Sequence, residues 1–241
     1  MEHERVELLN GISVFAPLEP RQLGDVAKRC RWNLFRKGQT LIEASEPSTD
    51  VFFVVEGAVA AKEFSLDGKE VTYAQINAGE IFGEFSALDG QLRSATIYAL
   101  ENARVACMSA NMFRSVMQEY PSVAVRVSQH LVKKLRFLSQ RVFEFSTLSV
   151  KYRIQAELLR YCDAATIEGN IARIEPAPTH HEIATRISTH REAVSREISQ
   201  LEMEGLISAS RQKIIVLDVE RLRANLHPLL TEKMHTKDGR A

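Results

Sequence analysis

The spacing of apolar residues changes near residue 109, and this change most constrains how the chain can fold. From Gly38 to Met108, short β-branched and aromatic runs such as DVFFVVEGAVAAKEF and EVTYAQI alternate with turn residues. Such runs are typical of strands in a sandwich or barrel. Asp67-Gly68, within the turn Leu66–Lys69, predicts a hairpin between two of them. Beyond Ser109 the spacing is helical, so we expect a β domain followed by helices.

The segment that precedes the strands, from about Arg5 to Asn33, is predicted to be helical, with breaks at Pro17 and Pro20. The chain begins MEHERVELLNG, which lacks the basic start and the apolar core of a secretory signal. No apolar run approaches the roughly 20 residues that span a bilayer. We therefore expect a cytoplasmic protein that has no membrane partner.

Composition excludes several classes of protein. The 241 residues favour two domains, and 45% hydrophobic with 26% charged residues is ordinary for a globular chain. The formal net charge is zero, so bulk charge gives no support for nucleic-acid binding. Cys30, Cys107 and Cys162 lack CxxC spacing. They are predicted to be buried thiols rather than a disulfide framework or a zinc site.

A narrow apolar stripe recurs at alternating steps of three and four residues. It consists of Ser128, Leu131, Leu135, Leu138, Val142 and Phe145. This a/d spacing predicts a helix of about 25 residues from Pro121. The stripe could pack on its own domain, but its narrowness and its basic flanks favour a partner helix, so we predict dimerisation. The flanking residues are Lys133, Lys134, Arg136 and Arg141.

The chain beyond this helix changes character several times. The short polar stretch Ser146–Ser149 is predicted to be a hinge, and VKYRIQAELLRYCDAA a further helix. Glu168-Gly169-Asn170 predicts a turn, and IARIEP a short strand before Pro176 and Pro178. These elements lead to Thr179.

Two short helices joined by a tight turn are predicted between Thr179 and Gly205. Thr179 and Glu182 have the spacing of a capping box, so a helix begins there. Ser188–His190 is a polar break between two apolar helical faces. The first face is Ile183, Ala184 and Ile187, and the second is Val194, Ile198, Leu201 and Met203.

After Gly205, two apolar runs flank Ser208–Lys213 and predict a two-stranded wing. In a helix-turn-helix, the first residues of the second helix enter the major groove of DNA. Arginine there bonds guanine in a bidentate way, and glutamate accepts from cytosine. The alternative is a solvated charged helix with a Glu192–Arg196 pair, and the wing favours DNA binding. The predicted DNA-binding residues are Thr179, His180, Thr189, His190, Arg191, Glu192, Ser195 and Arg196.

The segment THHEIATRISTHREAVSREISQLEMEGLI resembles the winged helix-turn-helix of the cyclic AMP receptor and fumarate-nitrate regulator superfamily of bacterial transcription regulators. In the cyclic AMP receptor branch, an Arg-Glu-x-x-x-Arg pattern reads a TGTGA-like half-site. Arg191, Glu192 and Arg196 match it. One departure is Ser188, where the family usually has glycine; serine is strained in that conformation.

The segment IFGEFSALDGQLRSATIYAL, residues 81–100, is similar to the phosphate-binding cassette of the same family. Gly83 lets backbone amides approach an anion, and Arg93 can fork onto a phosphate. Ser94 and the amide of Ala95 add donors, and Glu84, beside Phe85, can accept a ribose hydroxyl. The alternative is that Arg93 merely pairs with Glu84 on a loop. The segment predicts cyclic nucleotide binding.

The resemblance does not fix the nucleotide. It implies that Leu138 and Ser139 occupy the positions of the family's Thr-Ser contact with adenine, so the threonine contact is missing. Cyclic AMP is favoured, and cyclic GMP or another ligand stays open. Arg136 and Arg141 are alternative contacts with the base.

The predicted fold is α+β, with a cyclic-nucleotide-binding β-roll at 1–120, a dimerisation helix and hinge at 121–149, and a winged helix-turn-helix at 150–241. The resemblance implies an allosteric homodimer that binds a palindromic DNA site and RNA polymerase. The hypothesis is that bound nucleotide extends or reorders the helix through the hinge, at Phe145–Val150, and sets the two DNA-reading helices about 34 Å apart. The resemblance argues against haem and iron–sulfur sensing, because no histidine lies between His3 and His130 and Cys30 is the only cysteine before the cassette.

Two other classes of function compete with this prediction. A cyclic-nucleotide-binding regulatory protein that acts on a protein partner would not need the segment 179–216. An enzyme acting on nucleotides lacks support, because paired carboxylates, metal-ligand clusters and nucleophile motifs are not found in the sequence. His180-His181 is interpreted as a polar helix start rather than a metal site. We therefore expect a regulator with no enzymatic activity and no metal.

Overall fold

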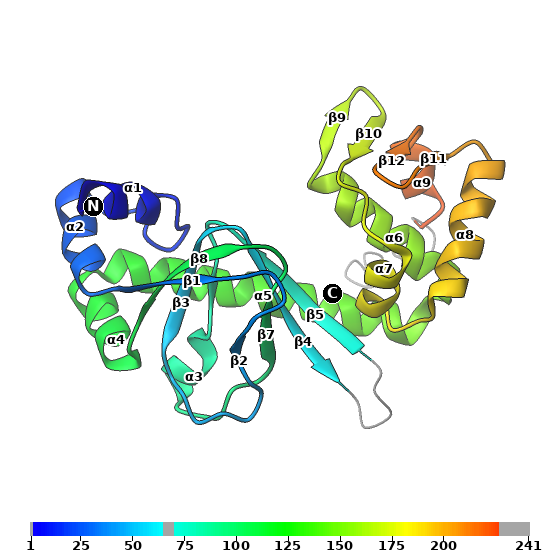
Figure 1. Cartoon of the computed structure of the whole chain (residues 1–241). Helices are drawn as coiled ribbons and strands as arrows, with labels where there is room; N and C mark the ends of the chain where they lie inside the picture. The colour runs from blue at the N-terminus through cyan, green and yellow to red at the C-terminus, as the bar shows by residue number, and fades with distance from the viewer. Residues whose placement is uncertain (1, 65–69, 227–241) are drawn as a thin grey trace, which may run out of the picture. The chain divides into compact units, whose positions relative to one another are not determined.

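A computed structural model describes residues 2–64 and 70–226 (Figure 1). The chain divides into two compact units, residues 1–137 and residues 138–241. The predicted turn Leu66–Lys69 lies outside the described residues. The division into 1–120, 121–149 and 150–241 stays a prediction.

The N-terminal unit is built around two four-stranded antiparallel sheets, ordered β1-β8-β3-β6 and β2-β7-β4-β5. This arrangement agrees with the predicted sandwich or barrel. The strands are β1 (Arg31–Phe35), β2 (Thr40–Ile42), β3 (Val51–Glu56), β4 (Ala58–Phe64), β5 (Glu70–Asn77), β6 (Ile81–Phe82), β7 (Thr96–Ala99) and β8 (Ala103–Met108). The helices are α1 (Glu2–Asn10), α2 (Pro20–Lys28), α3 (Glu84–Asp89), α4 (Ala110–Glu119) and the first part of α5 (Pro121–Thr147).

One prediction for the N-terminal segment is confirmed and one is wrong. The helical segment is interrupted, as predicted, between Asn10 and Pro20, which begins α2 and whose missing N–H leaves no hydrogen bond unmade there. Glu19 and Gln22 form a capping box at that end. Residues 31–33 are not helical, because they pair with β8 as part of β1. Pairing with a strand more than 70 residues away overrides the local pattern.

An aromatic cluster holds the sheets against the helices of the N-terminal unit. The ring of Phe53 in β3 lies 4.8 Å from that of Phe15 and 6.2 Å from that of Phe113 in α4. Val123 and Val127 of α5 belong to the same buried cluster. One face of α5 is therefore part of the core of this unit.

The opposite face of α5 is exposed and apolar. Leu135 and Val142 are each 65% exposed, and Val125 and Val132 are also exposed. At 3.6 residues per turn the exposed stripe consists of Val125, Ser128, Val132, Leu135, Ser139 and Val142. We call it the α5 seam. The predicted stripe was wrong in part, because Leu131 packs against the core of its own unit.

The C-terminal unit contains the end of α5 and a small α+β fold. Its helices are α6 (Val150–Asp163), α7 (His180–Arg186), α8 (Arg191–Met203) and α9 (Val219–Ala224). Its strands are β9 (Thr166–Glu168), β10 (Ile171–Ile174), β11 (Ile207–Ala209) and β12 (Ile214–Val216), in the order β11-β12-β10-β9. The predicted pair of helices, the strand at 171 and the wing are confirmed. Strand β9, beside the Gly169 turn, was missed.

Between α5 and α6 the helix breaks at Leu148-Ser149, which falls inside the predicted hinge.

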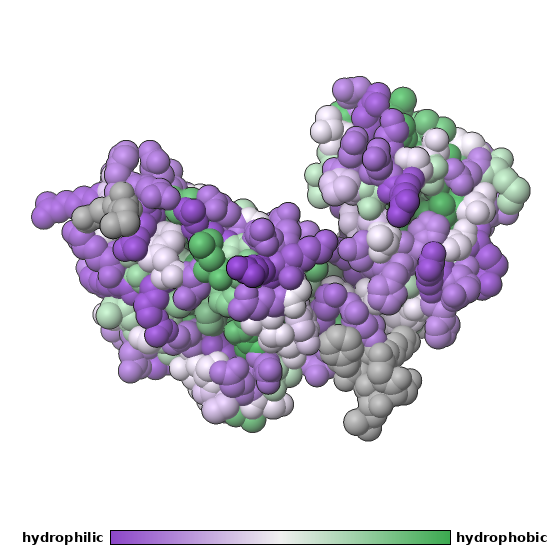
Figure 2. Space-filling view, in the orientation of Figure 1, coloured by the Kyte–Doolittle hydropathy of each residue, from purple (hydrophilic) through white to green (hydrophobic). Residues whose placement is uncertain are grey.

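Cys30, Cys107 and Cys162 are free and buried, as predicted. Burial raises the pKa of Cys30 to about 12 and that of Cys162 to about 11, so both stay protonated near neutral pH. Figure 2 shows a mostly hydrophilic face on both units, broken by small apolar patches. Among residues 2–64 and 70–226, no helix has the length and apolar character to cross a membrane.

Candidate functional site

Arg93 is a buried cation at the centre of the predicted cassette. It is 5% exposed and precedes β7. Its Nε donates to Ser48 Oγ at 2.9 Å, and its Nη1 and Nη2 donate to the backbone oxygens of Gly83 and Asp50 at 3.0 and 2.8 Å. All three acceptors are uncharged. Burial lowers the pKa of Arg93 but leaves the group a cation, because arginine stays protonated in proteins.

Gly83 lies directly against the Arg93 guanidinium and leaves the space that this group occupies. Its φ of 77° lies in the left-handed region, where the chain turns from β6 into α3. A Cβ at this position would lie 2.8 Å from Arg93 Nη1 and 2.8 Å from the Asp50 oxygen. The backbone angle and the close approach of Arg93 both require glycine.

Glu84 is the buried anion of the cassette, and its partners come from α5. Lys134 Nζ lies 2.7 Å from Glu84 Oε1, and His130 Nε2 lies 3.5 Å from the same oxygen. Burial alone would raise the pKa of Glu84, but these contacts outweigh burial and lower it. The alternative that Arg93 merely pairs with Glu84 is therefore wrong. Glu84 is held as a carboxylate.

The sequence did not single out His130, and it placed Lys134 only as a flank of the stripe. The available signal was their four-residue spacing, which puts them on one side of a helix, beside Val123 and Val127. Lys134 Nζ also lies 5.2 Å from the centre of the Phe85 ring. Two residues of α5 thus meet the first turn of α3.

The other predicted ligand residues are less constrained. Ser94 is exposed and Ala95 half-buried before β7. Leu138 and Ser139 are exposed on α5 and belong to the C-terminal unit, so their contact with a base stays a prediction. Arg136 is exposed, whereas Arg141 is 8% exposed and bonded to Glu157. The prediction that Arg141 meets the base is wrong, because ion pairs within the C-terminal unit occupy it.

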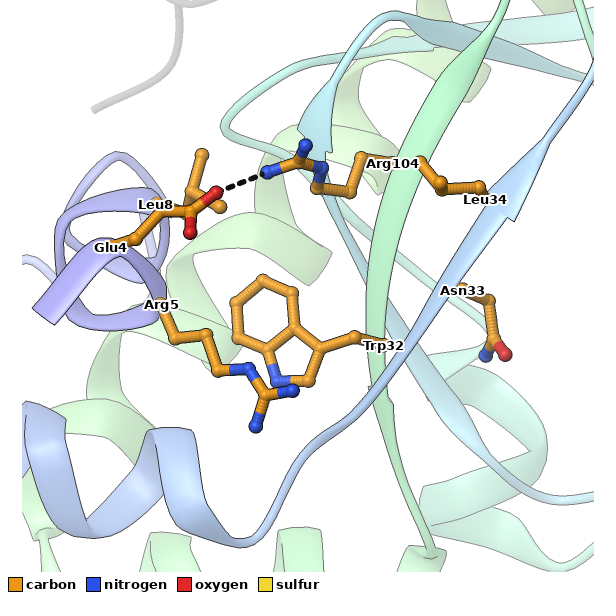
Figure 3. A pocket seen from close by; sticks show the side chains of 7 residues that line it. All are labelled: Glu4, Arg5, Leu8, Trp32, Asn33, Leu34 and Arg104. Carbon is orange, nitrogen blue, oxygen red and sulfur yellow. Dashed lines mark hydrogen bonds and ion pairs between the residues drawn. The ribbon is translucent and has the colours of Figure 1, made fainter. Parts of the chain in front are cut away.

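A cavity of about 230 Å³ lies elsewhere in the N-terminal unit, between α1, β1 and β8 (Figure 3). Its lining residues are Glu4, Arg5, Leu8, Trp32, Asn33, Leu34 and Arg104. Arg104 pairs with Glu4 at 2.9 Å, and the Arg5 guanidinium lies 5.6 Å from the Trp32 ring centre. This cavity shares no residue with the cassette, so it is separate from the candidate nucleotide site.

The first helix of the helix-turn-helix begins where the sequence predicts. Thr179 Oγ1 accepts from the Glu182 amide at 3.1 Å, and the Thr179 amide donates to Glu182 Oε2 at 2.7 Å. This reciprocal pair is the predicted capping box. At the other end, Ser188 has a φ of 52°, which is the left-handed conformation expected at the family's glycine position.

The second helix, α8, presents a charged face to solvent. Arg191, Glu192 and Arg196 are exposed, and Val194, Ile198 and Leu201 are buried. Met203 was predicted to be part of the apolar face, but it is 77% exposed near the helix end. Ser195 Oγ lies 2.8 Å from His180 Nδ1, so α7 and α8 are joined beside the predicted base readers.

Comparison with known families agrees with both candidate sites, the cassette in the N-terminal unit and the helix-turn-helix in the C-terminal unit. The cyclic nucleotide-binding domain family matches residues 32–120, and the Crp-like helix-turn-helix domain family matches residues 152–225. The cAMP-activated global transcriptional regulator CRP of Pasteurella multocida is 31% identical over 198 residues, 78% of this chain and 90% of that protein. The CRP-like cAMP-activated global transcriptional regulator of Mycobacterium tuberculosis is 24% identical over 217 residues, 90% of this chain and 97% of that protein.

Solved structures show the same fold. A CooA mutant from Carboxydothermus hydrogenoformans has a TM-score of 0.75 at 20% identity, covering 83% of this chain and 89% of that one. A CRP/FNR family regulator from Thermus thermophilus has a TM-score of 0.66 at 25% identity, covering 80% and 97%. The chain is therefore a DNA-binding transcription regulator with a cyclic nucleotide-binding domain. It belongs to the CRP/FNR family, as the sequence resemblance predicted.

The close packing of the Arg93 guanidinium against Gly83 can be tested directly by substitution. Gly83→Ala should destabilise the protein by about 1–3 kcal/mol more than Gly90→Ala, measured by urea unfolding. Gly90 is the matched control, because its φ is 74° but a Cβ there would meet nothing within 4 Å. Equal destabilisation by the two substitutions would show that the position of the Arg93 guanidinium does not require the missing side chain at Gly83.

Proposed function

We propose that this protein is a homodimeric transcription regulator that binds cyclic AMP at the cassette and, when it is bound, a palindromic TGTGA-like DNA site. The observation that best supports this proposal is the buried Arg93 guanidinium, whose three hydrogen-bond acceptors are uncharged. A phosphate anion would add the charge that these acceptors lack. The relatives from Pasteurella multocida and Mycobacterium tuberculosis are named as cAMP-activated, which favours cyclic AMP over cyclic GMP.

The residues of the cassette fit a cyclic nucleotide. Arg93 and the amides near Gly83, Ser94 and Ala95 would hold the phosphate. Glu84 is buried and ionised, and its remaining lone pairs can accept a ribose hydroxyl while Lys134 offsets its charge. Leu138 and Ser139 would meet the base from α5. Phosphate, ribose and base would thus each have partners.

The α5 seam supports the homodimer. An exposed row of valine and leucine at a/d spacing is unfavourable in water and is buried when two such helices pack together. Ser128 and Ser139 interrupt the apolar row. The seam contains Ser139, so a predicted base contact lies at the proposed dimer interface.

Gating follows from a two-state equilibrium. Nucleotide favours DNA binding only if it binds the DNA-competent state more tightly. The break at Leu148-Ser149, between α5 and α6, is the segment whose reordering would set the spacing of the two α8 helices. Arg191, Glu192 and Arg196 would read bases, with Thr179, His180, Thr189, His190 and Ser195 beside them. Contact with RNA polymerase stays a prediction.

The ligand assignment is tested by calorimetric titration with cyclic AMP, cyclic GMP and cyclic di-GMP. Cyclic AMP should bind most tightly, and Arg93→Ala should weaken its binding by about 100-fold, because a charge-assisted pair of bonds is lost. Arg36→Ala, an exposed substitution in the same unit, is the control. Circular dichroism checks that Arg93→Ala is folded. Equal cyclic AMP binding by Arg93→Ala and wild type would overturn the site.

Base reading is tested by binding to palindromic DNA. Arg191→Ala should cost about 1–3 kcal/mol and relax discrimination at one base pair, since a bidentate contact is lost. Arg223→Ala, on the exposed part of α9, should leave both affinity and discrimination unchanged. If the wild-type protein binds palindromic DNA with the same affinity with and without nucleotide, nucleotide does not regulate DNA binding and the allosteric proposal is wrong.

The dimer is tested by sedimentation equilibrium. Leu135→Glu places a charge in the α5 seam and should weaken the dimer by at least about tenfold, because a buried unpaired charge is costly. Lys133→Glu changes an exposed residue that lies outside the seam on the same helix and serves as the control. If Leu135→Glu dimerises as tightly as wild type, α5 is not the interface.

A further inference from the structure

A buried charge cluster lies in the C-terminal unit, beside the turn between α7 and α8. We define it as Arg141, Glu144, Glu157, Arg160 and Arg186. The Glu144 and Glu157 side chains are each only 4% exposed. Arg141 Nη1 lies 3.1 Å from Glu157 Oε2, and Arg160 Nη1 lies 2.7 Å from the same oxygen. The end of α5, α6 and α7 thus meet in one ion-pair network.

The cluster contains three guanidinium groups and two carboxylates, and one of its guanidinium groups also bonds a backbone oxygen. Arg141 Nη2 donates to the backbone oxygen of Arg186, the last residue of α7. Arg153 of α6 donates in the same way to the Ile187 oxygen, at 2.9 Å. These carbonyls end a helix, where backbone oxygens lack intrahelical partners and carry partial negative charge. Two cationic side chains therefore bond the C-terminal end of α7.

The same two arginines contact one aromatic ring. Phe145, in the last turns of α5, has its ring centre 4.9 Å from the Arg141 guanidinium and 5.3 Å from that of Arg153. Phe145 is 40% exposed, one helical turn from Val142 of the α5 seam. Because Arg141 and Phe145 both belong to α5, a shift in the end of this helix would move Arg141 directly and would reach Arg153 of α6 through the ring.

We propose that Arg141 and Arg153 are positioning residues for the DNA-reading helix α8, and that Phe145 links the end of α5, which carries Arg141, to Arg153 of α6. Arg141 and Arg153 bond the carbonyls of the two residues that precede Ser188, whose left-handed conformation sets the turn between α7 and α8. The regulatory part of this inference rests on the proposed nucleotide gating. The positioning part does not, because its contacts lie within the C-terminal unit.

The proposed positioning role requires a guanidinium group at Arg141 and Arg153 and an aromatic ring at Phe145. A guanidinium can bond a carboxylate with one nitrogen and a carbonyl with another, as Arg141 does. Lysine keeps the charge but loses the planar fork. Leucine in place of Phe145 keeps the apolar volume but loses the π face that attracts a cation. These substitutions remove the geometry while preserving charge or bulk.

The experiment compares Arg153→Lys, Arg141→Lys and Phe145→Leu in the full-length protein, with Arg223→Lys as the control. Arg223 also pairs with a carboxylate, but in an exposed position on α9. Affinity is measured for a palindromic site and for scrambled DNA of equal length, with and without cyclic AMP. Hydrogen exchange of residues 184–190 reports on the turn directly, through the Thr189 amide that donates to Ala184 at 3.0 Å.

Both arginine variants should bind the palindromic site about tenfold more weakly and scrambled DNA unchanged, with faster exchange in the turn. Phe145→Leu should keep the affinity without nucleotide, but reduce the enhancement by cyclic AMP about tenfold. Equal losses on both DNAs would indicate general damage and overturn the positioning role. So would results matching those of Arg223→Lys.

Failure of the proposed function is distinguishable from failure of this inference. If wild type shows no cyclic AMP response, the gating proposal and the role of Phe145 both fail. The ratio of palindromic to scrambled affinity and the exchange of residues 184–190 still decide the role of Arg141 and Arg153. Unchanged exchange in both arginine variants would reject it.

Discussion

Burying a guanidinium group is costly unless hydrogen-bond acceptors surround it, and each unit of this protein contains such a buried group with oxygen acceptors around it. In the N-terminal unit, Arg93 is surrounded by two backbone carbonyls and a hydroxyl. These uncharged acceptors take three of its five N–H groups, so donors remain for the anion that we propose. In the C-terminal unit, Arg141 is bonded to carboxylates and to the end of α7. Its charge is thus used within the fold, for position rather than for binding.

The long helix α5 serves both units because its residues divide among its faces. His130 and Lys134 meet Glu84 of the cassette, and Arg141 meets Glu157 of α6. The α5 seam on the opposite side is apolar and exposed. Residues of α5 thus contribute to the candidate ligand site in the N-terminal unit and to the turn of the helix-turn-helix in the C-terminal unit.

Local patterns predicted the parts of this molecule whose structure is decided locally. The Thr179 capping box depends on residues three positions apart, and the wing on short runs separated by a turn. The partners of Arg93 were not predictable in this way, because Ser48 and Asp50 lie 45 and 43 residues earlier. The register of the α5 seam was missed for a similar reason. Leu131 and Leu135 look equivalent in sequence, and only packing against the distant core separates them.

Ser188 shows how a departure from the family pattern is accommodated. A residue other than glycine at φ 52° is strained and persists only where its surroundings determine the conformation. Those surroundings are bonds on either side of it: Arg153 holds the Ile187 carbonyl, and the Thr189 amide is bonded to Ala184. The turn conformation is thus held partly from α6, outside the helix-turn-helix itself. A strained turn held from outside can change when its supports move, which suits a DNA-binding element whose activity is regulated.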